Sequence, residues 1–510
     1  MNNNAYQRRS WRVPLPNEGA TRALAGQITA LVGAGDLLTL SGELGSGKTT
    51  FARYLIRLLL GDEGLEVPSP TYTLMQIYEG PSFPIVHADL YRLRGPDELS
   101  ELGWDEASEG ALVLVEWVDR AGDRAPADRL DIEFCMTDDN SDGARIAHIT
   151  PYGGFEPRLQ RILAIHDLLQ STGWADARRV HMTGDASARS YERLVKPGGS
   201  ALLMISPARR DGPAIRAGKP YSALAHLAED IRPFIAIGGA LAELGLSAPR
   251  ILGVDMESGL AVLEDLGPGL VVNDNGPIVE RYAEAVAVLA DLHGRRLPTS
   301  VPLPNGETYA IPPYDLPALL IEAELLIDWY AIESPASETG SISRIRFNEM
   351  WARALTPLGE EPATWSLRDY HSPNLIWLPE REGLKRVGLI DFQDCVLGHP
   401  AYDLVSLLQD ARITVHDDME LKLLSHYARL RRAQGEPFDM ALFARAYALL
   451  GAQRATKILG IFARLDRRDQ KPQYQRHVPR VERYLAKNLA HSALAEIRAW
   501  YQVNAPNILA

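Results

Sequence analysis

The stretch DLLTLSGELGSGKTTFARYLIRLLL, residues 36–60, contains an apolar run that predicts a strand, a glycine-rich turn, and a segment with the apolar spacing of a helix. The turn follows the pattern G-x-x-x-x-G-K-[ST]. Its glycines let backbone N–H groups point at phosphate oxygens, its lysine reaches the β and γ phosphates, and its threonine hydroxyl is a ligand for Mg²⁺. The flanking strand and helix favour a nucleotide-binding loop that takes ATP and Mg²⁺. The predicted contacts are Gly42, Gly45, Gly47, Lys48, Thr49 and Thr50.

The chain has 510 residues, 46% of them hydrophobic and 23% charged, and this length exceeds what a single core usually serves. We therefore expect at least two domains. The sequence has no apolar run of the roughly 18–20 residues that cross a bilayer, and the start lacks the apolar core of a signal peptide. Cys135 and Cys395 lack zinc-ligand spacing and fit a reducing compartment. These observations predict a cytoplasmic protein without a membrane contact.

The net charge of −13 is concentrated at the start of the chain, where residues 1–155 hold 13 Lys and Arg against 23 Asp and Glu. Nucleic-acid binding depends on basic side chains that neutralise phosphates. We therefore expect no direct grip on tRNA by this part, so any role near RNA would depend on partner proteins.

Strand and helix patterns alternate through the first third, with FPIVHADLY and ALVLVEWV as further buried strands, which is typical of an α/β domain with a mainly parallel sheet. A polar, turn-rich passage over residues 135–158 suggests a boundary near 150–157, and we predict domains at 1–153 and 154–510.

In the second domain, the stretch GDASARSYERLVKPGGSALLMISPA predicts a hairpin that turns at Pro-Gly-Gly. Helical spacing dominates from Tyr221 onward, and the Pro-rich residues 297–317 are expected to be a long connection. A small sheet lobe followed by a larger helical lobe predicts a bilobal α+β domain.

A second phosphate-transfer pattern lies in LRDYHSPNLIWLPEREGLKRVGLIDFQD, residues 367–394. The spacing from Asp369 to Asn374, then a strand, then Asp391 is typical of kinase-like folds. Asp369 is the expected catalytic group that accepts the proton of a substrate hydroxyl, whereas Asn374 and Asp391 are the expected Mg²⁺ ligands. We leave open whether His371 is functional or only satisfies buried backbone.

The first third resembles the TsaE family, the ATPases of bacterial tRNA threonylcarbamoyladenosine biosynthesis. SPTYTL (69–74), VHADLYRL (86–93) and LVEWVDRA (114–121) carry the resemblance, together with the glycine-rich loop. It covers roughly residues 15–135 and implies that Asp89 and Glu116 lie near Mg²⁺ and the attacking water, and that TsaB/TsaD-type proteins are partners. Considered alone, Asp89 could cap the following segment, and Thr71 could sense the γ-phosphate or belong to a turn.

The remainder resembles the aminoglycoside phosphotransferase and choline kinase superfamily through LADLH (289–293) and GHPAYDLVSLL (398–408), whose Asp403 would brace the catalytic loop. Within it, GDASARSYERL (184–194), LAVLEDLG (260–267) and AELLIDWY (323–330) are similar to AmgK-like anomeric sugar kinases. That resemblance implies ATP-dependent phosphorylation of the anomeric hydroxyl of N-acetylmuramate or N-acetylglucosamine in cell-wall recycling. It also implies a phosphate loop that includes Arg189, and an adenine-binding hinge around Glu264 and Asp265.

One departure from the kinase pattern is Met204, which occupies the position of the usual phosphate-binding lysine. Arg189 or another basic residue such as Lys219 could replace that lysine, or the second domain could be a pseudokinase that only binds partners. An aminoglycoside- or choline-type phosphotransferase is another alternative. The acidic run Glu322, Glu324 and Asp328 does not fall on one helix face, which favours a neutral or anionic sugar over a cationic acceptor.

Overall fold

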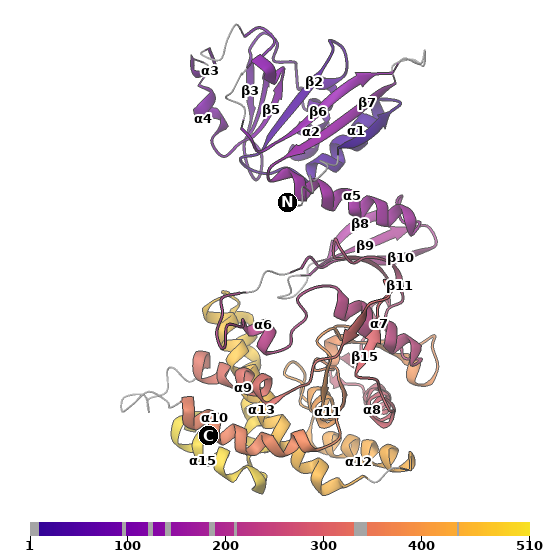
Figure 1. Ribbon diagram of the computed structural model, residues 1–510, viewed down its shortest axis with the longest axis vertical. Coiled ribbons are helices and arrows are strands. Elements are labelled where there is room, and N and C mark those ends of the chain that lie inside the picture. Colours follow the sequence, from indigo (N-terminus) through magenta and orange to yellow (C-terminus); the bar gives the residue numbers. More distant parts are fainter. Residues whose placement is uncertain are drawn as a thin grey trace, which may run out of the picture. The chain divides into compact units, whose positions relative to one another are not determined.

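The computed structural model describes residues 10–93, 98–101, 103–120, 126–137, 144–182, 189–208, 212–330, 344–435 and 438–509. The chain divides into two compact units, residues 1–167 and 168–510, and the division falls within helix α5 (Phe155–Ser171) (Figure 1). The limits 1–153 and 154–510 stay a prediction. Among the described residues, every helix is too short or too polar to cross a membrane.

The first unit is built on a seven-stranded sheet of order β1-β7-β6-β2-β5-β4-β3. The neighbours β6, β2, β5 and β4 are parallel, and the remaining pairs are antiparallel. This sheet has the alternation of strands and helices predicted from the sequence. The strands are β1 (Trp11–Leu15), β2 (Leu37–Gly42), β3 (Met75–Tyr78), β4 (Ile85–Asp89), β5 (Leu112–Glu116), β6 (Arg129–Met136) and β7 (Arg145–Tyr152). The helices before α5 are α1 (Glu18–Thr29), α2 (Lys48–Leu60), α3 (Glu98–Glu101) and α4 (Trp104–Ser108).

Both faces of the central strands are buried, which explains why their sequences are continuous apolar runs. In β5, Leu112 and Leu114 belong to one core with α1 and α2, whereas Val113 and Val115 belong to a second core on the other face. Successive side chains of a strand point to opposite faces. The parallel strands β2, β4 and β5 therefore end at one edge of a sheet that is fixed from both sides.

The expectation of a turn-rich passage over residues 135–158 is wrong in part, because β7 occupies residues 145–152. This strand pairs antiparallel with β6 and with β1. Burial alternates along β7, with Ala147 and Ile149 fully buried. The residues that alternate with them, such as His148 and Thr150, are polar and lie on a half-exposed face. They hide the apolar pattern from which a strand is predicted.

The second unit begins with an antiparallel sheet of order β11-β12-β10-β9-β8. The β9–β10 hairpin turns at Pro197-Gly198, as the sequence predicts. The five strands are β8 (Arg178–Met182), β9 (Ser190–Lys196), β10 (Gly199–Ile205), β11 (Ile251–Asp255) and β12 (Leu260–Glu264). Short strands pair as β13 (Val272–Asn273) with β14 (Gly276–Pro277), β15 (Ser300–Pro302) with β16 (Thr308–Ala310), β17 (Thr364–Ser366) with β20 (Val396–Gly398), and β18 (Leu375–Trp377) with β19 (Val387–Leu389). The expected long connection over 297–317 thus contains the hairpin β15–β16.

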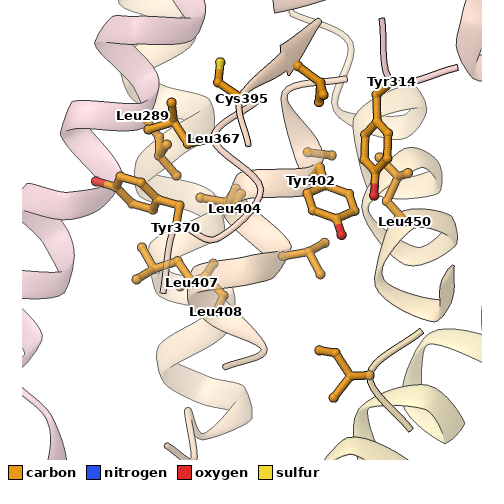
Figure 2. Packing of buried hydrophobic residues seen from close by; sticks show 14 of the residues in the cluster. Leu289, Tyr314, Leu367, Tyr370, Cys395, Tyr402, Leu404, Leu407, Leu408 and Leu450 are labelled. Atoms are coloured by element: carbon orange, nitrogen blue, oxygen red, sulfur yellow. The ribbon is translucent and has the colours of Figure 1, made fainter. Parts of the chain in front are cut away.

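Helices dominate the rest of this unit, so the predicted order of a sheet followed by helices is present. They are α6 (Tyr221–Leu224), α7 (Arg232–Glu243), α8 (Val279–Gly294), α9 (Leu316–Leu325), α10 (Arg344–Leu355), α11 (Ala401–Leu408), α12 (Asp417–Ala433), α13 (Met440–Arg467), α14 (Val478–Leu489) and α15 (Ala495–Asn504). One hydrophobic core joins α7, α8, α11 and α13. Figure 2 shows Leu367 and Tyr370 in this core beside Leu404 and Leu407 of α11, so buried side chains anchor the segment that carries Asp369.

Candidate active sites

The glycine-rich loop joins β2 to α2 in the first unit and depends on backbone conformations that favour glycine. Gly42, Gly45 and Gly47 have φ values of 130°, 81° and 106°. A Cβ atom on Gly42 would lie 2.4 Å from the carbonyl oxygen of Phe134. The loop delivers the chain to the N-terminus of α2, where free N–H groups and the helix dipole favour an anion.

Lys48, the first residue of α2, folds back over this loop. Its Nζ atom donates to the carbonyl oxygens of Gly42 at 2.9 Å and Glu43 at 3.0 Å, and lies 4.4 Å from the centroid of the Trp117 ring. Burial lowers the pKa of Lys48, although the nearby carboxylates of Glu116 and Asp89 act in the opposite direction. The ammonium group is thus held among the oxygens of the loop and close to two acidic side chains.

Asp89 and Glu116 end the parallel strands β4 and β5 and are paired in register. Both are buried, at 4% and 2% exposure. The Thr49 hydroxyl donates to Glu116 Oε1 at 2.9 Å, and the Thr71 hydroxyl donates to Asp89 Oδ2 at 2.8 Å. Asp89 also accepts from the Tyr91 N–H group at 3.0 Å, so it caps the following segment as well. The strand order therefore brings both predicted carboxylates to the loop.

A cavity of about 270 Å³ lies over these groups. Among the predicted residues, Gly42 is not one of its lining residues. The lining residues are Leu44, Gly45, Gly47, Lys48, Thr49, Thr50, Ser69, Thr71, Asp89, Tyr91, Glu116, Trp117 and Arg145. Sequence reasoning missed Arg145, whose Nη2 atom donates to the Gly45 carbonyl oxygen at 3.3 Å. Arg145 is the first residue of β7, and its place beside the loop depends on the pairing of this strand, which the sequence pattern does not indicate.

The second site lies in the second unit, where short paired strands deliver three polar side chains. Asp369 follows β17, Asn374 precedes β18, and Asp391 follows β19. The Nδ2 atom of Asn374 donates to the Asp369 carbonyl oxygen at 2.9 Å and to Asp391 Oδ2 at 3.3 Å. Asp391 Oδ1 also accepts from Arg189 Nη2 at 3.1 Å. The three predicted residues and Arg189 thus form one connected group.

Asp403, on the first turn of α11, holds the backbone before Asp369 in place. This fully buried carboxylate accepts from the N–H groups of Leu367 at 2.7 Å and Arg368 at 2.8 Å. Arg368 has a φ of 63°, an uncommon left-handed conformation for a residue with a side chain. These bonds are the ones expected of a residue that braces the loop.

The electrostatics of the second site keep the expected base ionised. Burial raises the pKa of Asp369, but the positive groups around it, His371 and Arg454 foremost, outweigh burial and leave that pKa below its usual value. Burial lowers the pKa of His371, although the carboxylates of Asp410 and Asp369 act in the opposite direction. The lowered pKa of Asp369 means that it can orient a hydroxyl group as a carboxylate.

A cavity of about 590 Å³ connects Asp369, Asn374, Asp391 and Arg189 with apolar side chains of the sheet lobe, including Leu202 and Leu263. Met204 is fully buried in the core, and Lys219 is exposed and does not line this cavity. Of the two candidates to replace the missing lysine, only Arg189 reaches the site. Residues 183–188, most of the expected phosphate loop, lie outside the described part of the chain.

The side chains of the expected hinge are engaged outside this cavity. Glu264 accepts from Arg381 at 2.8 Å, and its own N–H group donates to the Arg250 carbonyl oxygen at 2.9 Å. Asp265 accepts from the Ser200 hydroxyl at 2.9 Å. Their neighbour Leu263 lines the cavity instead. The assignment of Glu264 and Asp265 to nucleotide binding remains a prediction.

Comparisons with known proteins divide the chain in the same two parts. Residues 15–146 match the family described as "Threonylcarbamoyl adenosine biosynthesis protein TsaE", and residues 180–438 match the "Phosphotransferase enzyme family". Both resemblances inferred from the sequence are thereby confirmed.

Individual relatives cover each part nearly completely. An N-acetylmuramate/N-acetylglucosamine kinase of Caulobacter vibrioides is 40% identical over 357 residues, which are 66% of this chain and 95% of the relative. One from Pseudomonas aeruginosa is 30% identical over 344 residues, 65% of this chain and 90% of the relative. The tRNA threonylcarbamoyladenosine biosynthesis protein TsaE of Rickettsia bellii is 37% identical over 136 residues, 27% of this chain and 92% of the relative.

Proposed function

Because this chain belongs to the TsaE family over residues 15–146 and to the phosphotransferase enzyme family over residues 180–438, we propose that it has two separate ATP-dependent activities. The first unit hydrolyses ATP in support of tRNA threonylcarbamoyladenosine formation. The second phosphorylates the anomeric hydroxyl of N-acetylmuramate and N-acetylglucosamine. The observation that carries the kinase assignment is the connected group of Asp369, Asn374 and Asp391 in a large cavity.

In the kinase reaction, Asp369 accepts a hydrogen bond from the sugar hydroxyl and takes its proton as phosphoryl transfer proceeds. Carboxylate and amide oxygens suit Mg²⁺, so Asp391 and Asn374 would hold the metal, which neutralises charge on the phosphates. Arg189 contacts phosphate oxygens in place of the missing lysine. Leu202 and Leu263 provide the apolar wall for adenine. Most of the catalytic effect comes from positioning and electrostatics.

In the ATPase reaction, the loop N–H groups and Lys48 bind the phosphates, and the Thr49 hydroxyl would be a Mg²⁺ ligand. Glu116 and Asp89 lie at the carboxyl ends of parallel strands, where they would hold the metal and orient the attacking water. Hydrolysis changes contacts with TsaB- and TsaD-type partner proteins. The acidic character of residues 1–155 supports a role in which those partners, and not this unit, hold the tRNA.

The charges in the second unit favour a sugar over a cationic acceptor. Glu322 is fully buried and bound to Arg368 and to Lys457 Nζ at 2.7 Å. Glu324 accepts from Arg216 Nη2 and Arg344 Nη1, each at 2.7 Å. Both carboxylates are neutralised by basic side chains of the chain itself. They are therefore not available to the amino groups of an aminoglycoside or the ammonium group of choline.

The kinase assignment is tested with the purified chain, ATP, Mg²⁺ and a panel of N-acetylmuramate, N-acetylglucosamine, kanamycin and choline. We expect an anomeric sugar phosphate, identified by phosphorus NMR. Asp369→Asn should lower the rate by about 10²–10⁴-fold, as loss of a general base does. Asp418→Asn, which changes an exposed aspartate on α12, is the matched control. Turnover of only kanamycin or choline would refute the sugar assignment, and no turnover of any acceptor would favour a pseudokinase.

The ATPase assignment is tested by replacing Lys48. Lys48→Ala should abolish tRNA modification in a complementation assay, because the variant cannot bind the phosphates, and should leave sugar phosphorylation intact. Arg22→Ala removes an exposed cation of the same unit and is the control. Full complementation by Lys48→Ala would contradict the assigned role of the loop.

A further inference from the structure

One face of helix α13 forms a wall of the kinase cavity. The residues of α13 that line it include Arg454, Lys457, Ile458, Ile461 and Arg464. Most of these are three or four positions apart, so they lie along one side of the helix. This wall contains three basic side chains and no acidic one.

Three of the other basic groups of the cavity are already paired with carboxylates. Glu322 binds both Lys457 and Arg368, and Arg189 binds Asp391. Arg454, like Arg412 and Arg464, forms no ion pair among the described residues. It is 5% exposed, and its Nε atom has no hydrogen-bond acceptor. Its guanidinium group lies 5.7 Å from the centroid of the Tyr402 ring. Tyr402 and the carboxylate of Asp369 favour its charge from nearby. A buried guanidinium group with an unsatisfied N–H group is still costly unless a ligand supplies an acceptor.

Arg412 is a second cation of this kind, on the segment between α11 and α12. It is half-buried, lines the same cavity, and has no ion pair within the described part of the chain. Its Nη1 atom lies 3.5 Å from His371 Nε2, two residues from Asp369. Arg454 lowers the pKa of Asp369, and both arginines lower the pKa of His371, so both cavity-lining arginines lie within electrostatic reach of the catalytic segment.

We propose that Arg454, together with Arg412, forms a binding site for the carboxylate of an acidic sugar. The inference rests on the proposed function, in which N-acetylmuramate carries a lactyl carboxylate that N-acetylglucosamine lacks. Six covalent bonds of about 1.5 Å join the anomeric oxygen to the carboxyl carbon, so the carboxylate stays within about 8 Å of the reacting hydroxyl. Arg464 lies ten residues from Arg454, about 15 Å along the helix, which is nearly twice that span.

The test compares the two sugars in the full chain. Arg454→Gln should lower kcat/KM for N-acetylmuramate at least tenfold more than for N-acetylglucosamine, because only the first loses a charge-assisted hydrogen bond. Arg412→Gln should act in the same direction, and Arg454→Lys should restore part of the preference. Arg464→Gln is the matched control and should leave the ratio of the two efficiencies unchanged. Equal losses for both sugars would overturn the proposal and assign Arg454 to the support of Asp369.

A measurement on the unaltered chain keeps the proposal testable if Arg454→Gln does not fold. The methyl ester of N-acetylmuramate keeps the shape of the substrate and lacks its charge. We expect its kcat/KM to be at least tenfold below that of the acid, and the remaining activity to be insensitive to Arg412→Gln. Equal use of ester and acid would overturn the carboxylate site, whereas phosphorylation of neither sugar by the unaltered chain would overturn the proposed function itself.

Discussion

At position 42, the backbone conformation and the neighbouring chain leave room only for glycine. An added Cβ atom would meet the Phe134 carbonyl oxygen at 2.4 Å, in a backbone conformation with a φ of 130°. Gly42→Ala should therefore lower the free energy of unfolding of the first unit by about 1–3 kcal/mol. Urea denaturation measures this change. Gly35→Ala is the control, because its φ is 81° and the added atom meets open space. Equal effects of the two substitutions would contradict the role of the clash.

Glu322 gives a second prediction, through pH. Burial raises the pKa of Glu322, but Lys457 and Arg368 outweigh burial and hold that pKa below its usual value. The ionised group therefore stabilises the fold above the unfolded pKa of about 4.3, and this contribution is lost as pH falls through the lower, folded value. Glu322→Gln should cost about 3–5 kcal/mol at neutral pH, since it leaves buried cations unpaired.

The check for Glu322 is urea denaturation of both chains over a pH series. The gap between them should narrow as pH falls below about 4.3, because only the unaltered chain loses an ionised group there. Asp418→Asn changes an exposed carboxylate and should show no such gap at any pH. A gap for Glu322→Gln that is independent of pH would show that the charge of Glu322 is not what stabilises the fold.

Residues that belong to a local motif could be predicted, whereas isolated ones could not. The loop after β2 contains Lys48 and Thr49, and the strands β4 and β5 end at Asp89 and Glu116. Each of these sequence patterns has a chemical reason, and the four side chains line one cavity. Arg145 and Arg454 line the two cavities without any neighbouring motif. They line a cavity because the fold brings them next to segments that are distant in the sequence. The pattern of a single helix or strand does not predict those contacts.

At the scale of elements, the position of α11 decides the shape of the catalytic segment. Asp403 accepts hydrogen bonds from two consecutive backbone N–H groups ahead of Asp369. Asp403→Asn places an amide donor in a site that needs acceptors, and should destabilise the second unit by about 1–3 kcal/mol. The kinase rate should fall at temperatures where the variant is still folded, as circular dichroism can verify. Asp439→Asn changes a helix N-cap on α13 and serves as control. An unchanged rate for Asp403→Asn would contradict the bracing role.

Helices and strands were predictable where the spacing of apolar residues and the residues of the adjoining turn indicate the same structure. The β9–β10 hairpin has a Pro-Gly turn between alternating strands, and β2, β4 and β5 are long apolar runs. Strand β7 was not predictable in the same way, because polar residues on its half-exposed face interrupt the apolar pattern. The hairpin β15–β16 was hidden by prolines, which short strands at an edge tolerate.

At the scale of the whole molecule, the two units have separate hydrophobic cores, and we expect them to respond separately to ligands. N-acetylmuramate at a hundred times its Kd should stabilise the second unit by about 2.7 kcal/mol and leave the first unchanged. Calorimetry of the full chain would resolve this as one shifted and one unshifted transition. The same shift should occur in Lys48→Ala. A single transition that moves as a whole would show that the units unfold together.

Lys48 is the only lysine among residues 1–167, and it donates to two carbonyl oxygens of its own loop. Its lowered pKa leaves more of its amine in the uncharged, nucleophilic form than is usual for lysine. A reagent that reacts with lysine amines therefore labels a single lysine side chain in this unit. The rate of that labelling, with and without nucleotide, would follow the exchange of loop oxygens for phosphate oxygens directly, so the nucleotide loop contains its own chemical reporter.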